Sequence, residues 1–271
     1  MQQSVKRVGC LAQFEITRLC LTKSGVLSLL AFATAWLIIL YYPVNYAVEW
    51  VYSDSLKDIA RDIFGAFGIS ELLNWPVPEI AMYWLIALFL YPIFAIIISS
   101  DQTCADRARG TLRFITLRAS RTEIIYGRFL GQVLILTGLI ALTLIASVII
   151  AVMRDSSLIS VAFSLSFFVF FELVIVILPF IALMSFFNSF SNSSRKSIIY
   201  VGLFYGLLPM IFALLESYVG QLSYLYYIFP GIQLSNIINP TDIELSFHLL
   251  PLIQMLVLLV LSQFLMKRTS I

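Results

Sequence analysis

The sequence predicts an all-α polytopic membrane protein with six transmembrane helices. Of its 271 residues, 61% are hydrophobic and only 12% are charged, and long apolar stretches separate the charges. A soluble globular domain carries about 25% charged residues, so that class is excluded. Six spans of about 20 residues with their loops fill a chain of this length. We therefore expect one membrane domain over residues 1–271, with no sizeable soluble domain.

The spans should be helices, because backbone polar groups in lipid must be hydrogen-bonded within the segment. The alternating pattern of a membrane barrel is not seen in the sequence. The fourth apolar stretch is longer than a span requires and contains Pro179, so we expect a tilt, a kink or a second short element near Phe186. The predicted spans cover residues 26–48, 80–99, 129–153, 158–187, 198–215 and 249–266.

Residues 1–24 predict an amphipathic helix that lies in the cytoplasmic interface before the first span. Leu11 and Phe14 interrupt its polar face. A basic leader that only orients the first span is the alternative. The apolar arc consists of Val5, Val8, Ala12, Ile16 and Leu19, and the polar residues beside it are Lys6, Arg7, Gln13 and Arg18.

The cationic residues set the orientation of the spans. All but three of the 17 Lys and Arg residues fall before the first span, between the second and third, or after the fourth and sixth. The exceptions are Lys57, Arg61 and Arg154. The positive-inside rule places the richer side, with both termini, in the cytoplasm. We therefore expect a multi-pass protein of the cytoplasmic (inner) membrane, with no nucleic acid as partner.

The loop between the second and third spans, residues 101–131, is the most distinctive stretch. Gly110 can end a helix that extends from the second span. Residues 111–117 are too short to cross a membrane and are half apolar, which predicts a short helix. Ser120 and Glu123 form a capping box that starts the next helix. The loop contains Arg107, Arg109, Arg113, Arg118, Arg121 and Arg128.

A basic, half-apolar hairpin of this kind suits docking onto another cytoplasmic protein. The alternative is that its arginines only enforce topology and bind anionic lipid headgroups. Gly127 and Gly131 follow as a G-x-x-x-G pair at the start of the third span, where helix backbones can approach closely. That pair predicts packing within the chain or a seam between two copies.

Two further residues bear on mechanism. Glu172 lies well inside an apolar span, where a carboxylate is costly, so it indicates either a substrate path or a structural hydrogen bond to a neighbouring helix. His248 is the only histidine, which leaves no histidine cluster for a metal and no His-based catalytic triad within the chain. The sequence also lacks a G-x-x-x-x-G-K-[ST] phosphate loop. We predict no enzymatic site and no cofactor in this chain.

The external segments are rich in aromatic residues. Residues 216–247 contain a dense tyrosine run before Pro230 and Gly231, which indicates either an aromatic interface belt or re-entrant and interfacial helices before the sixth span. The loop at residues 49–79 includes DIFGAFGISELL, a candidate interfacial helix.

The hairpin region resembles the signature region of the ABC-2 type permease family, the membrane subunits of ATP-binding-cassette exporters. The family usually has an acidic residue where this chain has Arg113 and a proline where it has Arg118, which favours a more acidic partner surface. The matching residues are Asp106, Arg107, Gly110, Thr111, Leu112, Ser120, Arg121, Glu123, Ile124, Gly127, Leu130 and Gly131.

The resemblance implies a connecting helix before the first span, a cytoplasmic coupling helix in the hairpin and re-entrant outer helices before the last span. It also implies a nucleotide-binding ATPase subunit that holds ATP and Mg, and a second permease copy or homologue in a dimer. The residues it implies for ATPase docking are Arg109, Gly110, Thr111, Leu112, Arg113, Phe114, Arg118 and Arg121.

Two rival functions belong to other classes. One is a secondary transporter driven by protons through Glu172, and the other is a non-transporting membrane scaffold or immunity protein. Composition does not separate these from the exporter subunit, and the loop motif favours the exporter. Its cargo could be a small molecule, a lipid, a peptide or a sulfur species.

Overall fold

The computed structural model describes residues 2–52, 75–216, 222–232 and 245–268. Within these ranges every regular element is helical, and six helices are long and apolar enough to cross a membrane. The chain is therefore an all-α polytopic membrane protein, as predicted. The elements are α1 Gln2–Leu21, α2 Lys23–Ile39, η1 Leu40–Val44, α3 Ala47–Tyr52, α5 Pro78–Ile98, η3 Ser99–Asp101, α6 Cys104–Ala108, α7 Leu112–Thr116, α8 Arg121–Arg154, η4 Ser156–Leu158, α9 Ile159–Asn188, α10 Ser194–Glu216, η5 Leu222–Ile228 and α11 Leu245–Arg268.

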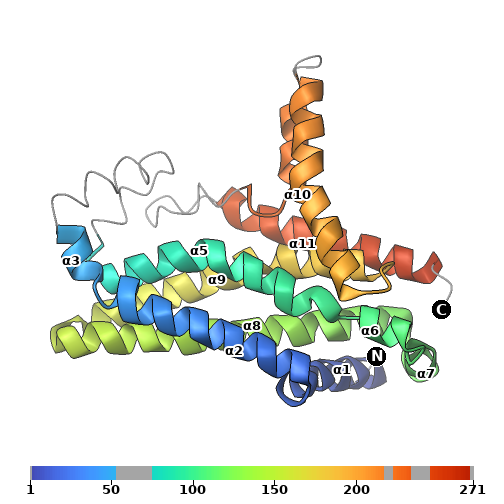
Figure 1. Cartoon of the computed structure of the whole chain (residues 1–271), viewed down its shortest axis with the longest axis horizontal. Coiled ribbons are helices and arrows are strands. Elements are labelled where there is room, and N and C mark those ends of the chain that lie inside the picture. Colours follow the sequence, from blue (N-terminus) through green and yellow to red (C-terminus); the bar gives the residue numbers. More distant parts are fainter. Residues whose placement is uncertain (1, 53–74, 217–221, 233–244, 269–271) are drawn as a thin grey trace.

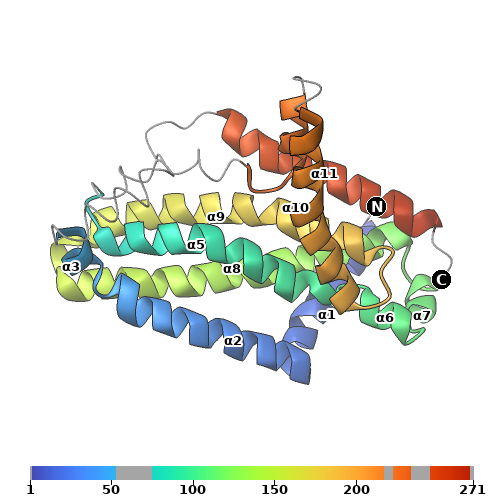
Figure 2. The same ribbon diagram turned by 45° about the horizontal axis from the view of Figure 1, so that its top comes forward.

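Three long helices, α5, α8 and α9, lie side by side and form the core (Figures 1 and 2). Helix α11 packs along α9, and α1 packs along α8. The most apolar 18-residue window of α9 is 61% buried, which identifies α9 as the central helix. The largest fully buried side chains here include Tyr83, Trp84, Tyr91, Leu136, Ile140 and Leu173.

Helix α10 is arranged differently from the other candidate spans. In both views its axis runs across the direction of α5, α8 and α9 (Figures 1 and 2). Its most apolar window is only 6% buried. The helix predicted over residues 198–215 is thus present, but most of its apolar surface is not covered by the described residues.

The helix ends can be compared with the signals in the sequence. The third long helix begins at Arg121, as the Ser120–Glu123 capping box predicts, and it includes the apolar stretch 129–153. Helix α9 continues through Pro179 to Asn188, so no second element forms near Phe186. In the first predicted span, α2 ends at Ile39 and passes into a π-helical turn that contains Pro43.

Helix α1 forms where the amphipathic helix is predicted, and Val8, Ala12 and Leu19 of the predicted apolar arc lie on its packed side, but the buried face is rotated relative to that arc. Val5 is 67% exposed and Ile16 is 39% exposed, whereas Ala12 and Glu15 are almost fully buried against α8. Leu11, predicted to interrupt the polar face, packs against the core. The reason is a tertiary contact, because α8 supplies both an ion-pair partner for Glu15 and two glycines that give α1 room.

Only parts of the external segments can be compared with the prediction. The short helix η5, Leu222–Ile228, precedes α11 and is tied to it, because Gln254 Nε2 donates to the carbonyl oxygen of Tyr227 at 2.7 Å. Tyr205 of α10 donates its hydroxyl to the carbonyl oxygen of Pro230 at 3.0 Å. The predicted interfacial helix at 62–73 lies outside the described residues.

Candidate functional site

The candidate site is a hairpin made of α6, α7 and the residues that join them to α5 and α8. Gly110 separates the two short helices with a φ of 72°, a left-handed conformation that favours glycine. Helix α7, Leu112–Thr116, is the short helix expected over residues 111–117. The hairpin lies at the same end of the molecule as α1 and the C-terminal end of α11 (Figure 1).

The tip of the hairpin is both apolar and basic. Leu112 is fully buried and anchors α7 to the core, whereas Phe114 is 71% exposed and Leu117 is 82% exposed. Arg113 and Arg118 are exposed beside them. A surface that leaves two large apolar side chains uncovered among cations fits a partner with an apolar pocket and acidic surroundings.

A cavity of about 580 Å³ runs between the hairpin and α1. Its basic rim includes Arg7, which also forms an ion pair with Glu123 of α8 at 3.6 Å. The prediction treated α1 and the hairpin separately, and no spacing in the sequence indicates that they share one cavity. Its lining residues are Lys6, Arg7, Cys10, Leu11, Phe114, Ile115, Leu117, Arg118 and Ala119.

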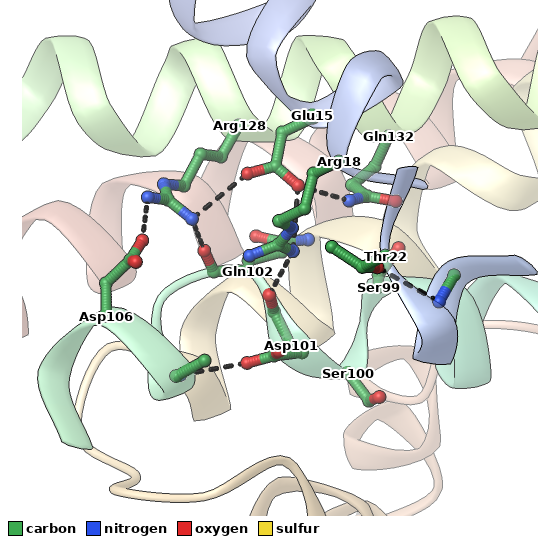
Figure 3. Close-up of polar contacts among 12 residues, drawn as sticks. Glu15, Arg18, Thr22, Ser99, Ser100, Asp101, Gln102, Asp106, Arg128 and Gln132 are labelled. Atoms are coloured by element: carbon green, nitrogen blue, oxygen red, sulfur yellow. Dashed lines mark hydrogen bonds and ion pairs between the residues drawn. The ribbon is translucent and has the colours of Figure 1, made fainter. Parts of the chain in front are cut away.

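A buried ion network holds the base of the hairpin (Figure 3). Arg128 of α8 is 1% exposed and donates to Glu15 of α1 at 3.0 Å, to Asp106 of α6 and to the carbonyl oxygen of Gln102. Three segments distant in the sequence therefore meet on one guanidinium. The sequence identified Arg128 only as one of the cationic residues on this side of the spans, and it gave no signal of these contacts.

Glu15 is the acidic centre of this network. Its carboxylate also forms an ion pair with Arg18 of the same helix at 2.9 Å and accepts a hydrogen bond from the side-chain amide of Gln132 at 3.0 Å. Burial raises the pKa of Glu15, while the neighbouring Arg128 and Arg18 act in the opposite direction. A buried carboxylate of this kind remains charged only while its donors stay in place.

A second anchor ties the hairpin to the end of α9. Arg107 donates to the carbonyl oxygens of Ser189 at 2.5 Å and Ser191 at 3.0 Å, where α9 has ended and its last carbonyls need donors. Cys104 contacts the side chain of Asn188 at 2.8 Å. The last residue of α9 is therefore held by the first helix of the hairpin.

Arg121, grouped with the docking residues above, contacts the end of α11. Its guanidinium donates to the carbonyl oxygens of Met266 at 2.5 Å and Lys267 at 3.0 Å. A cation at a helix C-terminus is favourable because the last carbonyls carry partial negative charge. The hairpin region thus contacts the ends of α9 and α11, and this second contact could not be read from spacing.

Gly127 and Gly131 face α1. A Cβ built on Gly127 would lie 2.6 Å from the Cβ of Leu11, and one on Gly131 would lie 2.7 Å from the Cβ of Glu15. Of the two alternatives for the G-x-x-x-G pair, the geometry is that of packing within the chain, which brings Glu15 within reach of Arg128.

Glu172 lies far from the hairpin in the fold, where α9 packs along α11. It is 6% exposed and its carboxylate contacts Nε2 of His248, four residues into α11. The two residues are 76 positions apart, so the sequence named no partner for Glu172 and interpreted His248 as interfacial only. Among the described residues, no group of three or more His, Cys, Asp or Glu side chains could hold a metal ion.

Comparison with known proteins identifies the family. A search of curated proteins finds no match to the chain. The model of the ABC-2 family transporter proteins matches residues 11–269, which includes the hairpin, the buried ion network and all six candidate spans. Because this match covers most of the 271 residues, the chain belongs to the ABC-2 transporter family.

Proposed function

We propose that this chain is the permease subunit of an exporter in the cytoplasmic membrane, and that a separate ATPase docks on its α6–α7 hairpin. The observation that supports this proposal is the exposed tip, where Phe114 and Leu117 stand uncovered beside Arg113 and Arg118. ATP and Mg would bind to the partner, and a second permease copy or homologue would complete the pathway.

In the proposed mechanism, contacts at the base of the hairpin connect movement of the tip to movement of α1, α8 and α9. ATP-driven closure of the ATPase subunits would push on the tip. Arg128 would pass that displacement to α8 and α1, and Arg107 would pass it to the end of α9. Since buried ion pairs have strict geometry, these helix ends should move together instead of sliding past one another. The reorienting helices would open a path between two permeases.

A pull-down from native membranes tests the docking. The tagged protein in mild detergent should retain a nucleotide-binding ATPase, and the double variant Arg113→Glu/Arg118→Glu should lose it at equal expression. Leu117→Asp should weaken the same contact through the apolar part of the tip. Lys23→Glu serves as the control, because it reverses an exposed charge at the start of α2, away from the tip.

Arg121 is left unchanged in this test, because its reversal would also disturb the end of α11. Retention of both the ATPase and export by the double variant would contradict the docking surface. If the folded wild-type protein retains no ATPase, the contact between Glu172 and His248 would instead support the proton-driven alternative. Flux that depends on a pH gradient and persists without ATP would then be the decisive observation.

A further inference from the structure

A second cavity, of about 550 Å³, lies where α1 turns into α2 beside the end of α5 and the start of α6. Exposed apolar side chains, Phe14, Leu21 and Ile97, stand among its lining residues. Leu21 is close in sequence to Val26, Leu27 and Leu30, which are exposed apolar residues on α2, a candidate span. The wall is rich in hydroxyl groups, contributed by Thr17, Thr22, Ser24, Ser28, Ser100 and Ser194.

The cavity also presents polar groups of both signs that the chain does not use. Arg109 is exposed and contacts no carboxylate in the ranges that the structure describes. Gln132 is 2% exposed, and its amide nitrogen donates to Glu15, but its amide oxygen has no hydrogen-bond partner. In Figure 3 that oxygen points away from Glu15. A buried acceptor without a donor is costly, which indicates that a ligand supplies one.

The carboxylates nearby are mostly satisfied within the chain. Glu15 is paired with Arg18 and Arg128, and Asp106 is paired with Arg128. Asp101 lines the cavity and uses one oxygen to accept from the backbone of Ala105. The hydroxyls of Thr17, Thr22, Ser28 and Ser100 already form hydrogen bonds to the backbone nearby. The remaining groups are therefore the Arg109 guanidinium, one amide oxygen and one carboxylate oxygen, beside apolar side chains.

We propose that this cavity binds the headgroup of a phospholipid that carries a primary ammonium. The phosphate would lie at Arg109, with Ser24 on the same wall. The ammonium would donate to the oxygens of Gln132 and Asp101. The acyl chains would lie over the apolar side chains of the cavity and continue along the exposed apolar face of α2. This inference is independent of the proposed ATPase docking.

Native mass spectrometry of the full chain, purified in detergent, tests the site. The probes are phosphatidylethanolamine, phosphatidylglycerol, glycerophosphoethanolamine and inorganic phosphate. We expect phosphatidylethanolamine to bind most tightly, and Arg109→Gln to weaken it about tenfold through loss of a charge-assisted hydrogen bond. Ser28→Phe should also reduce binding, because its larger ring fills the cavity. Arg113→Gln is the matched control, since it removes an exposed arginine of the same hairpin that does not line this cavity.

Loss of phosphatidylethanolamine in Arg109→Gln and Ser28→Phe, with retention in Arg113→Gln, would support the site. Equal binding by all four proteins would overturn it. Equal or tighter binding of phosphatidylglycerol would show that the ammonium contact is wrong. If glycerophosphoethanolamine or inorganic phosphate binds as tightly as the lipid, the cavity is a site for a soluble phosphate compound and the lipid assignment fails.

Discussion

Substituting Gly131 by alanine should force α1 away from α8, whereas the same substitution at Gly138 of the same helix should not. A Cβ on Gly131 would lie 2.7 Å from the Cβ of Glu15 and 3.0 Å from the carbonyl oxygen of Ala12, so something must shift. Nothing lies within 4 Å of a Cβ on Gly138. Overpacking costs about 1–3 kcal/mol, while alanine gains about 1 kcal/mol over glycine inside a helix.

We therefore expect Gly138→Ala to be neutral or stabilising by up to about 1 kcal/mol. Gly131→Ala should be about 1–3 kcal/mol less stable than Gly138→Ala, because both gain the same helix propensity and only one is overpacked. Gly127→Ala should resemble Gly131→Ala. Free energies of unfolding from SDS titration in mixed micelles, followed by circular dichroism, measure these differences. Equal stability of the three variants would refute the packing of α1 on α8.

Two further predictions concern buried charge. Arg128→Met should lower the free energy of unfolding by about 3–5 kcal/mol, because it removes one of the two cations paired with the buried Glu15 carboxylate and also removes the partner of Asp106. Burial raises the pKa of Glu15 and Arg128 acts against that rise, so the native variant should bind more protons than the native wild type. The loss should therefore shrink as the pH falls, as titrations at several pH values would show. The double variant Arg128→Met/Glu15→Gln should recover part of the loss, and strictly additive effects would argue against the pair. At the other contact, Glu172→Gln should be about 1–3 kcal/mol more stable than Glu172→Leu in thermal unfolding, because only Gln can still hydrogen-bond His248; the advantage should vanish in a His248→Leu background.

The hairpin could be predicted from the sequence because its signals are local. Gly110 ends one short helix, and Ser120 with Glu123 starts the next long one within a few residues. The full packing face of α1 could be predicted only in part, since hydrophobic periodicity identified Ala12 and favoured Val5 over Glu15. What decides it is Arg128, which lies 113 positions further along the chain and is buried with Glu15.

The contact between Glu172 and His248 shows the same limit. The apolar surroundings of Glu172 indicate that it needs a partner, because a lone carboxylate in a span is costly. They do not identify the partner, which depends on how α11 lies along α9. Nor does the sequence show that α10 runs across the core helices, because its length and hydropathy equal those of an ordinary span.

The arginines of the hairpin region divide into two groups that a purely topological role does not explain. Arg107 and Arg121 donate to the ends of α9 and α11, and Arg128 is buried between α1, α6 and α8. The positive-inside rule requires only charge near the membrane surface, so it gives no reason to bury a guanidinium among carboxylates. Arg109, Arg113 and Arg118 form the other group and are exposed. A base bound to several helices beneath an exposed tip therefore supports the proposal that a partner docks at the tip and displaces those helices together.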